Sequence, residues 1–313
     1  MDKENIFLSV IIYLHNAEKN ILNFMEMIHL FLNDNFDKFE IIFVDDASTD
    51  NSLNILKNAG IPKKMKGNVS IIHMSYYHGL ELSMSAGLDL VIGDFVLEFD
   101  SLLFDFPTQL IMEVYRRALE GYDVVSAVPE QKVAFFPRVF YFIFNCTKIR
   151  KQYELQRERF RLVSRRAINR VGAATKYVPY RKVLYSNCGL PVDIIKYKSD
   201  IREEKHYDSQ EISNRLNLAF NSLILFTHFV QWTTMALGLF FLIFALSIGC
   251  YTLGAYFSAH KPVEGWTMLM VFLSLSFSGV FLILTIINKY LALILSIVFV
   301  KQEYQISGVE KIS

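Results

Sequence analysis

The sequence contains little cysteine, proline or glycine, which narrows the kinds of protein it can form. Among 313 residues there are 3 Cys, 7 Pro and 14 Gly. Cys146, Cys188 and Cys250 lack the spacing of a zinc site and cannot form a disulfide framework, which fits a reducing compartment. Since 52% of the residues are hydrophobic and 20% are charged, the chain is not disordered and can bury a large core.

Several common active-site motifs are also absent. The sequence has no G-x-x-x-x-G-K-[ST] loop and no G-x-G-x-x-G after an expected strand, so we do not expect phosphate binding by a glycine-rich loop. It has no G-x-S-x-G elbow and no H-E-x-x-H pair, which argues against a serine hydrolase and a zinc enzyme. The net charge of +1 argues against a nucleic-acid partner.

The charged residues are unevenly distributed along the chain. Residues 1–131 contain 9 basic and 20 acidic side chains, whereas residues 132–206 contain 18 basic and 6 acidic ones. We interpret this division as two electrostatic tasks: carboxylates that hold a metal ion or a sugar, and a basic surface for phosphate or anionic lipid. Chance clustering of solvated charge is the alternative.

Strand-like and helix-like segments alternate over the acidic region. Strands are expected at Phe7–Tyr13, Glu40–Val44, Val69–His73, Phe95–Phe99 and Asp123–Ala127, and helices at Ala17–Leu32, Thr49–Asn58, Glu81–Val91 and Pro107–Leu119. This alternation predicts an α/β fold with a mostly parallel sheet. Ligands of such sheets bind beyond the carboxyl ends of the strands. The polar residues just after expected strands are Asn16, Asp45, Asp46 and Asp100.

Two long uncharged segments follow. No Asp, Glu, Lys or Arg occurs between Arg215 and Lys261, or between Glu264 and Lys289. Each segment can cross about 30 Å of hydrocarbon as a helix, so we predict two transmembrane helices, with buried core helices as the alternative. Most flanking lysines and arginines lie outside the short loop between the segments. This bias predicts that the α/β region and both termini lie in the cytoplasm. The membrane is expected to be the cell (inner) membrane.

These features divide the chain into three regions. Residues 1–215 are expected to form the cytoplasmic α/β domain, including a basic interfacial segment at 132–215. Residues 216–290 are expected to form the membrane domain, in which an amphipathic stretch at 216–227 precedes transmembrane helices at about 229–251 and 266–288. A cytoplasmic C-terminal tail is expected at 291–313.

Three blocks of the α/β region resemble a known enzyme family. They read LSVIIYLHNAEKNI from Leu8, IIFVDDASTDNSLNIL from Ile41 and HGLELSMSAGLDLVIGDFVLEFD from His78. They are similar to the opening blocks of inverting family-two glycosyltransferases, which have the GT-A fold. The later block FRLVSRRAINRV from Phe160, followed by two membrane segments, resembles the polyprenyl-phosphate branch, which includes dolichol-phosphate mannose synthases and bactoprenol glucosyltransferases.

The resemblance implies a nucleotide site at the ends of the first two expected strands. Its residues would be Asn16, Glu18, Asp45 and Asp46. Carboxylates suit this role because they accept hydrogen bonds from base N–H groups and ribose hydroxyls. Capping of the helix expected near Thr49 is the alternative for the two aspartates.

The metal motif departs from the family pattern. The family has D-x-D after the fourth strand, whereas this chain has Asp100, Ser101 and Leu102. The cation, Mg²⁺ or Mn²⁺, would bind weakly to Asp100, or Asp105 would assist, or arginines would replace it, since guanidinium groups bind phosphate well. We therefore expect metal dependence to be weak or absent.

Basic residues are expected to contact the phosphate of the acceptor. They are Arg161, Arg165, Arg202 and Lys205, and Arg161 would also act in catalysis with Asp100 and Asp105. Attraction of anionic lipid is an alternative role for the arginine-rich segment around Phe160.

The leading hypothesis is a membrane-anchored glycosyltransferase that moves a sugar from a nucleotide-sugar to polyprenyl (undecaprenyl or dolichyl) phosphate with inversion, for cell-envelope glycan or glycoconjugate synthesis. The alternative is a catalytically impaired, glycosyltransferase-like scaffold or binding subunit. Expected partners are the donor, the polyprenyl phosphate and membrane lipids, without nucleic acid. A homo-oligomer is left open.

Overall fold

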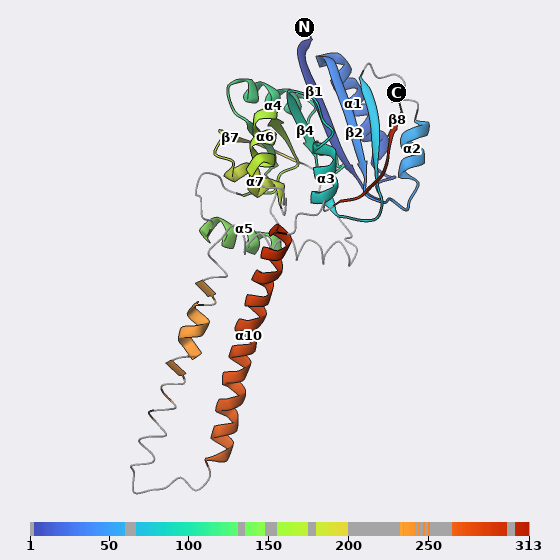
Figure 1. Cartoon of the computed structure of the whole chain (residues 1–313). Helices are drawn as coiled ribbons and strands as arrows, with labels where there is room; N and C mark the ends of the chain where they lie inside the picture. Colours follow the sequence, from blue (N-terminus) through green and yellow to red (C-terminus); the bar gives the residue numbers. More distant parts are fainter. Residues whose placement is uncertain are drawn as a thin grey trace.

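A computed structural model describes residues 3–59, 67–130, 135–147, 155–174, 180–199, 265–298 and 304–312, with parts of a helix between 232 and 250. A sheet with helices on its faces dominates this part of the chain (Figure 1). The strands are β1 (Glu4–Leu14), β2 (Phe36–Asp45), β3 (Asn68–Met74), β4 (Phe95–Phe99), β5 (Val124–Pro129), β6 (Phe160–Ser164), β7 (Val192–Tyr197) and β8 (Ile306–Lys311). The helices with complete bounds are α1 (Ile21–Asn35), α2 (Ser52–Asn58), α3 (Leu80–Leu88), α4 (Gln109–Leu119), α5 (Phe135–Thr147), α6 (Arg165–Ala174), α7 (Arg181–Asn187) and α10 (Trp266–Val298).

The strand order of the sheet is β7-β5-β6-β4-β1-β2-β3-β8. Strands β1 to β4 are parallel to their neighbours among themselves, and β5 is parallel to β7. Strand β6 runs antiparallel to both β4 and β5, so these two point the same way. The carboxyl ends of β1, β2, β3, β4, β5 and β7 therefore share one side of the sheet, which we call the carboxyl edge. The predicted α/β fold with a mostly parallel sheet is confirmed.

Apolar side chains bury both faces of the central strands. Val10, Ile11 and Ile12 of β1 are all fully buried, as expected for a parallel strand covered by helices on both sides. Helix α1 contributes Phe24 and Ile28, which are four residues apart and therefore lie on one helical face. This packing fixes the strand ends from which the loops of the carboxyl edge emerge.

Helix α10 extends away from the sheet (Figure 1). Within the described ranges, no helix was found that is both long enough and apolar enough to cross a membrane. The prediction of two transmembrane helices therefore has no support from the described residues. The amphipathic stretch expected at 216–227 lies outside them, as does much of the first predicted span at 229–251.

Part of the C-terminal tail expected at 291–313 joins the sheet as a strand. Strand β8 pairs antiparallel with β3, with Ile71 opposite Glu310, and is an outermost strand of the sheet. The strand is short and mostly exposed, so its own residues carry little apolar patterning. Its position depends on backbone pairing with a strand more than 200 residues earlier in the chain, which local sequence does not reveal.

Candidate functional site

The loops after β1 and β2 are hydrogen-bonded to each other at the carboxyl edge. The side-chain oxygen of Asn16 accepts from the backbone N–H groups of Thr49 at 2.9 Å and Asp50 at 3.3 Å. The backbone N–H of Glu18 donates to the Asp50 carboxylate at 3.0 Å, and the Glu18 carboxylate accepts from the Asn51 N–H at 3.3 Å. Asn16 has a φ of 46°, a left-handed conformation that asparagine tolerates. Two of the predicted nucleotide residues thus hold these loops together.

Asp46 fixes the loop that follows β3. Its side chain is fully buried, and one carboxylate oxygen accepts from the His78 backbone N–H at 2.7 Å. The other oxygen accepts from the Gly79 N–H at 2.8 Å and from the Tyr13 hydroxyl at 3.0 Å. Carboxylate hydrogen bonds to backbone N–H groups are charge-assisted and strong. Asp46 therefore shapes the surface of the carboxyl edge through the loop that it holds.

Asp45 has a related local role. One of its oxygens accepts from the Ser48 backbone N–H at 3.2 Å, and the other lies 3.7 Å from Nδ1 of His73. Helix α2 begins only at Ser52, and its N-cap has no side-chain hydrogen bond. Asp45 therefore closes the turn after β2 instead of capping α2.

Gln305, just before β8, contacts the loop after β3 at the carboxyl edge. The backbone N–H of Gln305 donates to Nε2 of His78 at 3.1 Å, and its carbonyl accepts from the Ser75 N–H at 2.9 Å. Asp46 and Gln305 thus hold the loop after β3 from two directions. Sequence reasoning missed this contact because neither residue 305 nor its neighbours belongs to a motif.

A buried charge network lies at the end of β4. Arg161 on β6 stands opposite Glu98 in the strand register and donates to Glu98 at 3.2 Å and to Asp100. Arg181 at the start of α7 donates to Glu98 at 2.6 Å, to Asp100 at 2.9 Å and to Glu81 of α3 at 2.9 Å. The most exposed of these five side chains is Asp100, at 12%. The structure thus joins the predicted Asp100 and Arg161 to Arg181, which the sequence did not single out.

The network shifts the pKa values of its two central acids in opposite directions. Burial raises the pKa of Glu98, although Arg181 and Arg161 oppose that shift. Burial alone would also raise the pKa of Asp100, but the two guanidinium groups outweigh it and hold the pKa well below its ordinary value. Asp100 therefore remains ionised at neutral pH, with its negative charge balanced by protein side chains.

Asp105 is also occupied by protein partners. Its carboxylate accepts from Arg159 at 2.7 Å, from the Tyr197 hydroxyl at 3.0 Å and from the Ser199 hydroxyl at 2.8 Å. Its side chain is fully buried. These contacts join the segment after β4 to the end of β7 and favour a positioning role for Asp105.

The predicted acceptor residues do not form one cluster. Arg165 donates to the backbone carbonyls of Val91 at 2.9 Å and Gly93 at 2.7 Å, near the amino end of β4 and thus away from Asp100. Arg202 and Lys205 lie outside the described residues. Of the four predicted residues, Arg161 is therefore the one that the structure places beside Asp100.

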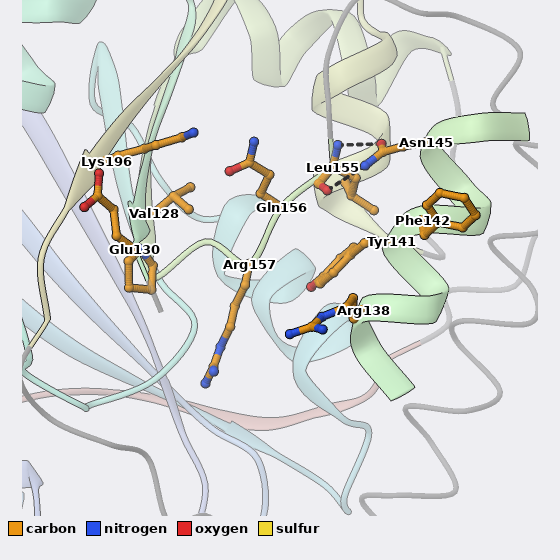
Figure 2. Close-up of a pocket in the computed structure, with 11 residues that line it drawn as sticks. Val128, Glu130, Arg138, Tyr141, Phe142, Asn145, Leu155, Gln156, Arg157 and Lys196 are labelled. Atoms are coloured by element: carbon orange, nitrogen blue, oxygen red, sulfur yellow. Dashed lines mark hydrogen bonds between the residues drawn. The ribbon is translucent and has the colours of Figure 1, made fainter. Parts of the chain in front are cut away.

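A cavity of about 600 Å³ opens at the carboxyl ends of β5 and β7. Figure 2 shows the side chains of α5 on one side, those of the strand ends on the other, and Gln156 and Arg157 between them. The lining residues are Val128, Pro129, Glu130, Arg138, Tyr141, Phe142, Asn145, Leu155, Gln156, Arg157 and Lys196. Three basic side chains and one acidic side chain thus stand beside apolar and aromatic groups. This lining suits a ligand with an anionic group and an apolar part.

Comparison with known proteins identifies the family. Residues 9–178, more than half of the chain, match the family described as Glycosyl transferase family 2. The chain belongs to this family. The resemblance of the three sequence blocks is therefore confirmed, and the protein is a family 2 glycosyltransferase by descent.

Named relatives of this family 2 glycosyltransferase cover different shares of its length. "Uncharacterized glycosyltransferase YkcC" of Bacillus subtilis (strain 168) is 25% identical over 301 residues, which cover 90% of this chain and 88% of the relative. "Undecaprenyl-phosphate 4-deoxy-4-formamido-L-arabinose transferase" of Edwardsiella ictaluri (strain 93-146) is 26% identical over 126 residues, covering 40% and 38%. Among solved structures, mannosyltransferase PcManGT from Pyrobaculum calidifontis, in complex with GDP-Man and Mn²⁺, has a TM-score of 0.49 at 16% identity, covering 87% and 86%.

Proposed function

We propose that this family 2 glycosyltransferase transfers a sugar from a nucleotide-sugar to a polyprenyl phosphate at the membrane. The cavity beside α5 carries the proposal, because its basic and apolar side chains match the two chemical halves of a lipid phosphate. The partial relative named for an undecaprenyl-phosphate substrate supports the same acceptor class. The cavity and the three cross-linked loops share the carboxyl edge, where ligands of parallel sheets bind.

In this proposal the loops after β1, β2 and β3 receive the nucleotide. Asn16 and Asp46 position these loops through the backbone hydrogen bonds described above. Glu18 is exposed on the same surface and offers a carboxylate to ribose hydroxyls or to a base N–H. The diphosphate and sugar would then extend toward the end of β4 and the cavity.

The lipid phosphate is the nucleophile in the proposed reaction. A phosphate monoester has a second pKa near 6, so it is largely dianionic at neutral pH and needs no general base. One of its oxygens forms a bond to the anomeric carbon while the bond from that carbon to the nucleoside diphosphate breaks. The electron pair leaves with the diphosphate, and this single displacement inverts the anomeric carbon.

The exposed apolar surface of α10 supports association with lipid. Phe277 and Phe281 are 54% and 66% exposed, and Leu284 is 50% exposed. Such continuous apolar surface is rare on proteins that contact only water. The rings of Phe244 and Phe272 stack with centroids 6.1 Å apart, so α10 contacts the preceding helical segment. We place the α/β domain on the cytoplasmic side because of the lysine and arginine bias around these segments.

A binding or scaffold subunit is the second candidate function. It is favoured by the network at Asp100, where Asp100 and Arg161, both expected to act in catalysis, are bonded to each other and buried, and where Arg181 binds the same acid. This subunit would retain the fold and its binding surfaces while transferring no sugar.

A kinetic comparison of cavity variants tests the proposal. In the full chain in membranes, Lys196→Gln and Arg157→Gln should each raise the KM for polyprenyl phosphate about fivefold, as expected for a lost contact of roughly 1 kcal/mol. Their KM for the nucleotide-sugar should stay unchanged. Lys198→Gln is the matched control, because Lys198 is exposed two residues from Lys196 and is not part of the cavity lining.

The outcomes separate the candidates. Transfer with an unchanged acceptor KM in both cavity variants would show that the lipid phosphate binds elsewhere. A wild-type protein that binds a nucleoside diphosphate but transfers nothing from any nucleotide-sugar would favour the scaffold function.

A further inference from the structure

Each carboxylate oxygen of Asp100 has a guanidinium partner. One accepts from Arg181 at 2.9 Å, and the other accepts from Arg161. Both arginine side chains are 1% exposed, and both also donate to the fully buried Glu98. Neither guanidinium can leave Asp100 without disturbing its bond to Glu98, so the positive charge beside Asp100 is built into the core.

The neighbouring positions supply no second ligand. Leu102, which stands where the family pattern has the second acid, is 5% exposed and packs in the same apolar cluster as Phe99 and Phe106. Asp105 is fully buried and already bonded to Arg159. The segment after β4 therefore directs a leucine and two aspartates, each paired with arginine, into the protein.

The donor set does not fit a divalent cation. Mg²⁺ takes about six oxygen ligands in a near-octahedral arrangement. Throughout the residues for which the structure gives side-chain positions, no three His, Cys, Asp or Glu side chains form a group that could hold a metal ion. Two guanidinium charges at Asp100 would also repel a cation placed there. The expected metal role of Asp100 thus disagrees with its surroundings.

We propose that Arg161 and Arg181 replace the divalent cation as the partners of Asp100, and that donor binding by this protein is independent of Mg²⁺ and Mn²⁺. The second half of this inference rests on the proposed binding of a nucleotide-sugar at the carboxyl edge. The first half depends only on the residues around Asp100.

Two measurements on the full chain in detergent test the inference separately. Electron paramagnetic resonance with Mn²⁺ alone should show no ion bound at Asp100. Asp100→Asn should therefore bind as much Mn²⁺ as the wild type, and so should Asp37→Asn, a control on the exposed part of β2. Calorimetric titrations with UDP and with GDP measure nucleotide affinity. For each nucleotide, the affinity in Mg²⁺ should lie within about twofold of the affinity in EDTA, a negligible difference in binding free energy.

Three results are decisive. Mn²⁺ binding that Asp100→Asn abolishes and Asp37→Asn preserves would overturn the first half. Nucleotide affinity about tenfold or more higher in Mg²⁺ than in EDTA would overturn the second half, and this arm needs only the wild-type chain. If neither nucleotide binds under any condition, the proposed donor site fails, while the Mn²⁺ measurement still decides whether Asp100 holds a cation.

Discussion

Replacing Arg181 with methionine should destabilise the α/β domain by about 3–5 kcal/mol, the usual cost of removing one partner from a buried ion pair. The Arg181 side chain is 1% exposed and donates to Glu81, Glu98 and Asp100. Methionine fills similar space without charge, so three buried carboxylates lose a cationic partner. The cost arises because Glu81 loses its cation while Glu98 and Asp100 keep only Arg161, and not from a cavity.

Amide hydrogen exchange measured by mass spectrometry is the suitable assay. The two tryptophans, Trp232 and Trp266, lie outside the α/β domain, so their fluorescence would not report on it. Exchange in peptides covering β4 and β6 should accelerate by roughly 100-fold to 1000-fold or more, because each 1.4 kcal/mol corresponds to a factor of about ten.

The matched control is Arg117→Met. Arg117 also pairs with two carboxylates, those of Asp193 and Glu120, but its side chain is 39% exposed. Exposed ion pairs contribute roughly 0–1 kcal/mol, so this variant should exchange nearly as slowly as the wild type. Equal exchange rates in β4 for Arg181→Met and Arg117→Met would refute the reasoning that the buried network stabilises this part of the sheet.

Three further predictions concern the loops and the network. Asp46→Ala should weaken nucleoside diphosphate binding by roughly 1–3 kcal/mol and speed exchange at 76–79, since two backbone N–H groups lose their acceptor; unchanged calorimetric affinity would contradict this. Gln305→Pro removes the N–H that reaches His78 and should loosen the same loop, whereas Gln305→Ala keeps that N–H and should match the wild type in exchange. Asp100 has a lowered pKa, so its stabilising contribution is present at neutral pH and is lost as the pH falls below its ordinary value of about 4. Denaturant titrations should therefore show a smaller acid-dependent loss of stability in Asp100→Asn than in the wild type.

The parallel part of the sheet was predictable because its strands are buried on both faces. Such strands have continuous apolar runs, and the expected strand at Glu40–Val44 lies within β2, where Ile41 to Val44 are all apolar and buried. Strand β6 was not predicted as a strand, since Arg161 interrupts its apolar residues. A buried arginine there is stable because Glu98 faces it from β4 and Asp100 also accepts from it. Both acids lie more than 60 positions before Arg161, so local pattern does not contain these contacts.

The site was predictable to a similar extent. The rule of carboxyl strand ends located Asn16, Asp46 and Asp100, all of which lie at the carboxyl edge. The rule does not reveal whether a carboxylate faces a ligand or another loop, because that depends on partners such as His78 and Arg181. The cavity went unpredicted for the same reason: it is formed by α5, two strand ends and the segment before β6, which meet only in the folded chain.

The most direct test of the central claim is a transfer assay with the full chain in membranes. Nucleotide-sugars labelled in the sugar are offered as a panel together with polyprenyl phosphate, and the organic phase is analysed for labelled lipid. The proposed function predicts a polyprenyl-phosphate sugar of inverted anomeric configuration from at least one donor. The replacement of the cation by Arg161 and Arg181 predicts equal yields in Mg²⁺ and in EDTA. Absence of labelled lipid with every donor, from protein whose fold is verified by hydrogen exchange, would contradict it.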